Sequence, residues 1–151
     1  MNPEDQKVID DVAKYRWHVV KVMEDSQGPA FAYSVGLYQT FKHPEIIVVG
    51  LPPDWMHQIA NNAGFAIRGG ARFEDGVRSG EILEKSEVTF REVLRAHYHD
   101  YLGIALWFYK KHHFPTLQCL WPDRDGRFPW DEGYSDSLKG LQTLLYAARV
   151  N

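Results

Sequence analysis

Large and small side chains alternate strictly around position 33, which is the clearest strand signal in the chain. Phe31, Tyr33, Val35 and Leu37 alternate with Ala30, Ala32, Ser34 and Gly36. This period of two predicts a strand with one bulky face and one small-residue face, and the small face favours close approach by another element or a ligand. Residues 15–23 are rich in β-branched and aromatic types, and residues 24–29 form a polar turn. Together they predict a hairpin with the alternating strand.

Apolar runs and helical spacing predict the remaining elements. Residues 46–51 are apolar and predict a central strand covered on both faces. Helical periodicity favours helices over residues 1–14, 52–68, 98–111 and 135–150. Strands are expected at residues 81–83, 88–93, 116–121 and 127–130, the last two joined as a second hairpin by Asp125 and Gly126. We therefore expect a single α+β domain over residues 1–151, with a mostly antiparallel sheet, about three helices and a split-barrel-like arrangement as one option.

Composition narrows the class of protein. The chain has 151 residues and a formal net charge of −3, so we expect one domain and no nucleic-acid partner. Its single cysteine, Cys119, forms no intrachain disulfide and suits a reducing compartment. No apolar run approaches the roughly 20 residues that span a bilayer, and the first residues do not resemble a secretion signal. We therefore expect a cytoplasmic protein without membrane association.

Aromatic residues are concentrated in the last third of the chain. Ten of the 21 tryptophan, tyrosine and phenylalanine residues lie between Tyr98 and Tyr134. Such a density is typical of a ligand cleft, which is mostly apolar with a few placed polar groups. It is equally typical of the bulky core of a small α+β domain. The sequence leaves both interpretations open.

Several motifs carry a family resemblance. Residues 118–130 contain Gln-x-x-Trp-Pro-Asp, which leads through a glycine turn to Phe-Pro-Trp. Upstream are Phe-Ala-Tyr-Ser-Val-Gly-Leu at residues 31–37, His-Pro-Glu at residues 43–45 and Val-Val-Gly-Leu-Pro at residues 48–52. In these motifs the chain resembles an uncharacterised bacterial family, domain of unknown function 4262. The resemblance extends from about Trp17 to Trp130 and is loose over residues 72–95. It implies no activity and no ligand, because the family has none attached to these positions.

Familiar catalytic and metal-binding patterns fit the chain poorly. The acidic pair Asp123 and Asp125 lacks the spacing of an EF-hand, because glycine falls at the fourth place. The histidines complete no recognised zinc motif, and Cys119 is expected to be a small buried hydrophobe. The glycine-rich segment 68–72 follows a predicted helix, which favours a helix cap over a phosphate loop. We therefore expect no metal site and no catalytic nucleophile.

We interpret the chain as a non-catalytic binding module that recognises a protein partner or a small molecule through an aromatic cleft beside the second hairpin. The expected contact residues are Trp121, Arg127 and Trp130, with Tyr33, His43, Tyr109 and Gln118 lining an adjoining cleft. One alternative is a flavin-dependent oxidoreductase-like enzyme, the only case in which a cofactor is expected. Another is a toxin-neutralising, immunity-like protein. A third places the site on the charged segment 72–95. Whether the chain is an enzyme, and its oligomeric state, stay open.

Overall fold

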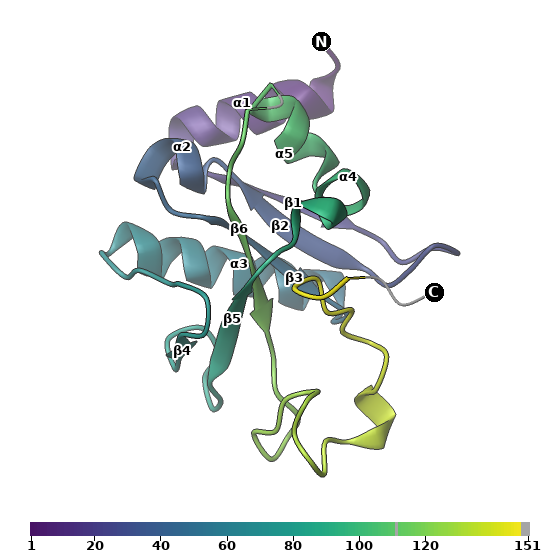
Figure 1. Ribbon diagram of the computed structural model, residues 1–151. Coiled ribbons are helices and arrows are strands. Elements are labelled where there is room, and N and C mark those ends of the chain that lie inside the picture. The colour runs from purple at the N-terminus through teal and green to yellow at the C-terminus, as the bar shows by residue number, and fades with distance from the viewer. Residues whose placement is uncertain (111, 149–151) are drawn as a thin grey trace.

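The computed structural model describes residues 1–110 and 112–148, and its centre is a six-stranded sheet of order β1-β2-β3-β6-β5-β4 (Figure 1). Only β3 and β6 pair in parallel, so the sheet is mostly antiparallel, as expected. The strands are β1 His18–Val22, β2 Phe31–Val35, β3 Glu45–Val49, β4 Arg78–Ser79, β5 Val88–Glu92 and β6 Thr116–Leu120. The helices are α1 Pro3–Tyr15, α2 Leu37–Phe41, α3 Pro53–Arg68, α4 Tyr98–Tyr101 and α5 Gly103–Phe108.

Helices cover both faces of the sheet, which confirms the α+β class. On one face, α3 packs on the small-residue side of β2, where Ala32 shares a core with Ala60 and Ala63. On the other face, α1, α4 and α5 pack on the bulky side of β2, with Tyr33 and Val35. The sheet is open rather than a closed barrel, since β1 and β4 stand at its two edges. Among the described residues, no helix is both long and apolar enough to cross a bilayer.

The second hairpin predicted at residues 116–130 is wrong. The neighbours of β6 are β3 and β5, and residues 127–130 belong to a loop at the lower end of the molecule in Figure 1. A backbone hydrogen bond of 2.7 Å from Asp123 N–H to the Arg127 carbonyl closes this loop, and side-chain contacts hold it instead of a strand ladder. The turn at Asp125 and Gly126 is therefore real, but no second strand follows it.

Three other expectations need correction. The predicted helix over 98–111 is broken at Leu102 into α4 and α5, after a 3₁₀ turn at Arg95–His97. Residues 81–83 form no strand. The described part of the predicted 135–150 helix contains only the 3₁₀ turn Asp136–Leu138, because the Gln118 side chain binds the backbone beyond it at Thr143 and Leu145. Residue 111 of the first predicted helix and residues 149 and 150 of the second lie outside the described residues.

A buried carboxylate joins the elements at the centre of the fold. Glu45 begins β3, is completely buried, and accepts hydrogen bonds from the backbone N–H groups of Gly36 (2.9 Å), Leu37 (3.2 Å) and Tyr38 (3.2 Å). These amides open α2, which has no side-chain cap of its own. Glu45 therefore caps α2 from a strand, and the φ of 110° at Gly36 lets the chain turn around the carboxylate.

Two hydroxyl groups complete the environment of Glu45. The Ser34 hydroxyl donates to the carboxylate over 2.7 Å, and the Tyr109 hydroxyl donates to it from the end of α5. Burial raises the pKa of Glu45, while the hydrogen bonds from Tyr109 and Ser34 oppose that rise. Burial, followed by the charge of Glu45, raises the pKa of Tyr109, so the phenol keeps its proton and remains a donor. One carboxylate thus connects β2, β3, α2 and α5.

We predict that Tyr109→Phe lowers the free energy of unfolding by about 2 kcal/mol, because it removes a donor to a buried carboxylate. Glu45→Gln should cost about 3 to 5 kcal/mol, since an amide NH₂ would then face hydrogen-bond donors. Urea denaturation of the purified variants measures both effects. Tyr38→Phe is the matched control, because no hydrogen bond is made by the Tyr38 hydroxyl among the described residues. Equal losses for the two tyrosine variants would contradict this role of Tyr109.

Candidate functional site

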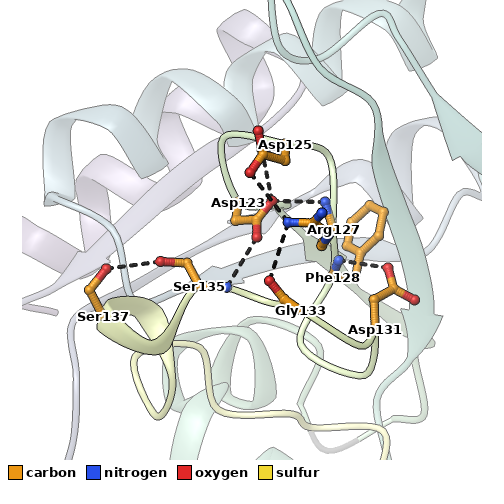
Figure 2. Close-up of polar contacts among 8 residues, drawn as sticks. All are labelled: Asp123, Asp125, Arg127, Phe128, Asp131, Gly133, Ser135 and Ser137. Atoms are coloured by element: carbon orange, nitrogen blue, oxygen red, sulfur yellow. Dashed lines mark hydrogen bonds and ion pairs between the residues drawn. The ribbon is translucent and has the colours of Figure 1, made fainter.

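The loop of residues 122–135 is organised around the carboxylate of Asp123 (Figure 2). One carboxylate oxygen accepts hydrogen bonds from the N–H groups of Asp125 and Arg127, each at 2.9 Å, and the other accepts one of 3.1 Å from Ser135 N–H. Burial would raise the pKa of Asp123, but these backbone hydrogen bonds, above all that from Arg127, lower it below its ordinary value. The loop is therefore held in one conformation without regular secondary structure.

The Arg127 side chain stabilises the same loop through two further hydrogen bonds. Its guanidinium donates to the Asp125 carboxylate and to the Gly133 carbonyl, both at 3.3 Å, while its side chain remains 46% exposed. Asp131 closes the next turn by accepting a hydrogen bond of 2.8 Å from Phe128 N–H. Arg127 is predicted from the sequence as a contact residue. Its side chain stabilises the loop and is also accessible to solvent.

Trp130 lies on this loop in a row of aromatic rings flanked by arginines. Its ring stacks on buried Phe128 with centroids 5.2 Å apart and planes 6° from parallel, and meets Tyr146 edge-on at 6.1 Å. Arg78 lies 5.0 Å over Phe128, and Arg91 lies 4.2 Å over Tyr146. Trp130 is 44% exposed. We call these five residues the Trp130 surface.

Gln118 and Trp121 hold the last part of the chain against the sheet. The Gln118 amide donates to the Thr143 carbonyl (2.7 Å) and accepts from Leu145 N–H (2.8 Å). The Gln142 amide in turn bonds both the N–H and the carbonyl of Trp121, whose indole N–H donates to the Val49 carbonyl over 2.8 Å. Trp121 is almost fully buried. Together with Trp55 it lines a hollow of about 420 Å³.

Tyr33, His43 and Tyr109 occupy separate positions in the interior. The Tyr33 hydroxyl accepts a hydrogen bond of 3.0 Å from Ile104 N–H, and burial raises the pKa of Tyr33 to about 12. Tyr109 contacts Glu45, as described above. Gln118 and Trp121 thus both bond the segment of residues 142–145, and Arg127 and Trp130 belong to one loop. The other three predicted residues each bond a different part of the fold.

His43 bonds through both ring nitrogens. Its Nδ1 lies 2.9 Å from the Pro44 carbonyl, and its Nε2 accepts a hydrogen bond of 2.9 Å from Phe73 N–H. These partners require a neutral ring with its proton on Nδ1. Burial lowers the pKa of His43 below its ordinary value of 6.5, and the nearby charge of Arg72 acts in the same direction.

The cysteine and the possible metal ligands of the chain show no arrangement for chemistry in the part that the structure describes. Cys119 is fully buried in β6, and burial raises the pKa of its thiol to about 12. Across the part of the chain that the structure describes, no three His, Cys, Asp or Glu side chains gather as metal ligands would. Glu45 is the central polar residue of the fold and was not predicted from the sequence. Its place in the His-Pro-Glu motif at the start of an apolar strand was a usable signal.

The fold and this loop define an α+β protein with an open mixed sheet and a rigid, partly aromatic loop at one end. A family model described as domain of unknown function (DUF4262) matches residues 11–135, so the chain belongs to that family. The match confirms the resemblance seen in the sequence motifs. No curated protein and no solved structure matches the chain significantly.

We predict that His43 makes the protein less stable in mild acid. Because its pKa is lowered on folding, the unfolded chain binds the proton more tightly, so stability falls as pH drops below the ordinary value of 6.5. Urea denaturation between about pH 8 and pH 5 should show a smaller loss of stability for His43→Gln than for the wild type. His99→Gln is the control, because the His99 side chain is 96% exposed. An identical pH dependence for both variants would contradict the prediction.

Proposed function

We propose that this protein is a non-catalytic binding module that recognises a partner protein through the Trp130 surface. The observation that carries the proposal is a tryptophan that is 44% exposed and nevertheless fixed between Phe128 and Tyr146. Tryptophan, tyrosine and arginine are the residues most often found at the energetic centre of protein interfaces. A side chain that is already immobilised loses little conformational entropy on binding.

A small hollow beside this surface favours a protein partner over a small molecule. It has a volume of about 290 Å³, at the lower end of small-molecule sites, and is lined partly by Arg78, Arg124 and Phe128. A hollow of this size suits one inserted side chain of a larger partner. The arginines at its border offer directed hydrogen bonds to carboxylate or carbonyl groups of that partner.

The interior supports binding rather than a chemical reaction. Glu45 is occupied by five donors, and His43 has a partner at each ring nitrogen. Burial keeps the Cys119 thiol protonated and inert as a nucleophile. These groups already serve the fold, so each would have to leave its partners before acting on a substrate.

We predict that Trp130→Ala abolishes capture of a partner that the wild-type protein retains from a host-cell lysate. Once that partner is identified, its dissociation constant should rise about 30-fold, which corresponds to about 2 kcal/mol for a central interface residue. Arg78→Ala should weaken binding in the same direction. Arg127→Ala is less suitable, because it also removes the hydrogen bonds to Asp125 and Gly133.

Trp55→Ala is the matched control, since Trp55 is a 64% exposed tryptophan outside the Trp130 surface. Thermal unfolding of all variants checks that the fold is retained. Equal capture by Trp130→Ala and Trp55→Ala would overturn the assignment of the site. A purified protein that carries a yellow flavin would instead favour the oxidoreductase-like alternative. A toxin as the captured partner would support the immunity-like alternative.

A further inference from the structure

A second hollow, which shares no residue with the Trp130 surface, lies where the end of α1, the start of β1 and one face of α3 meet. Its volume is about 690 Å³. His57, Asn61, Phe65 and Arg68 line it from α3, at spacings that place them on one helix face. Lys7, Asp11 and Lys14 line it from one face of α1. The connecting chain and β1 add Arg16, Trp17, His18 and Lys21, and Tyr15 lines the hollow from the last residue of α1. We call this hollow the α1–α3 pocket.

The charge of this pocket is opposite to that of the chain. Its lining holds five lysines and arginines against one aspartate, a formal charge of +4, whereas the whole chain carries −3. Lys7 pairs with Asp11 at 3.2 Å, and Lys21 pairs with Asp54 at 3.5 Å. Lys14, Arg16 and Arg68 have no carboxylate partner among the described residues. Three cationic groups thus remain unneutralised around one hollow.

Two helix ends bring the unpaired cations to this hollow. Lys14 and Arg68 stand in the last turns of α1 and α3, where a cation interacts favourably with the helix dipole. Lys7 is near the middle of α1, and Lys21 is on β1, so neither serves a helix end. Both lysines are paired with aspartates, whereas the unpaired Lys14, Arg16 and Arg68 stand at the ends of α1 and α3. Capping accounts for a cation at each helix end, but it does not require the two ends to share one hollow.

The walls of the pocket are held in place before any ligand arrives. The Trp17 indole N–H donates to Asn61 over 2.9 Å, and a Cβ at Gly64 would lie only 2.5 Å from the Trp17 ring. Only glycine permits that contact, which fixes α3 against the start of β1. The guanidinium of Arg68 lies 5.8 Å over the Trp17 ring. The Asp11 carboxylate holds His18 Nδ1 at 2.7 Å.

We infer that the α1–α3 pocket binds a small anion that carries phosphate groups. Several unneutralised cations around one hollow favour a compact multivalent anion over a single carboxylate, because each added negative charge meets another lysine or arginine. The rest of the chain is acidic, so a long polyanion such as nucleic acid would be repelled beyond the pocket. The volume of about 690 Å³ matches a small-molecule site.

We predict that the full-length protein binds pyrophosphate in isothermal titration calorimetry at low salt and that added salt weakens the binding. Lys14→Gln/Arg16→Gln should raise the dissociation constant about tenfold, because it removes two charges from exposed side chains and keeps most of their stems. Arg68→Gln should weaken binding from the opposite wall. Arg95→Gln/Lys139→Gln removes two exposed charges elsewhere and should leave the constant unchanged.

A parallel titration with ADP distinguishes two sources of the phosphate. Tighter binding of ADP than of pyrophosphate would support a nucleotide ligand, whose base could stack on the exposed ring of Tyr15 or Phe65. Equal binding would support recognition of the phosphate groups alone. The inference is overturned if neither probe binds, if the control double variant weakens binding as much as Lys14→Gln/Arg16→Gln, or if a single-stranded oligonucleotide binds more tightly than both probes.

Discussion

The fold depends most on the buried carboxylate of Glu45. Three backbone amides at the start of α2 and the hydroxyls of Ser34 and Tyr109 all donate to it. A carboxylate without these donors would be too costly to bury, and the start of α2 without the carboxylate would leave amides unpaired. Each group is therefore stable only because the other is present. This mutual dependence fixes β2, β3, α2 and α5 in one arrangement.

A second carboxylate applies the same principle at the surface. Asp123 accepts hydrogen bonds from three backbone amides and holds a loop that has no strand or helix. Because this loop is fixed, Trp130 can remain exposed in a defined position, stacked on Phe128. The core supplies the support, since Phe128 is buried and the C-terminal segment brings Tyr146 against Trp130. Surface recognition would thus rest on polar contacts made beneath the exposed ring.

Local patterns predicted the elements that long-range contacts did not override. The alternation around Tyr33 and the apolar run from Ile46 correctly gave two central strands, because each strand face meets a helix layer. The tail failed because its backbone is bound by Gln118, a residue far away in sequence. The predicted site residues are aromatic or polar for two different reasons. Tyr33 and His43, predicted to line a cleft, bond the core, whereas Trp130, predicted as a contact residue, is exposed.

The basic pocket shows why total charge is a poor guide to a local site. The sum over the chain is −3, which predicts no positive field that would hold the phosphates of a nucleic acid. The sum does not record that residues 7–21 and 57–68 contribute their cations to one hollow. Arg68 was interpreted as part of a helix cap, and Gly69 does end α3 as expected, yet the same arginine also faces the pocket. Helical spacing within α1 and α3 was visible in the sequence, but their juxtaposition across Trp17 and Gly64 required the fold.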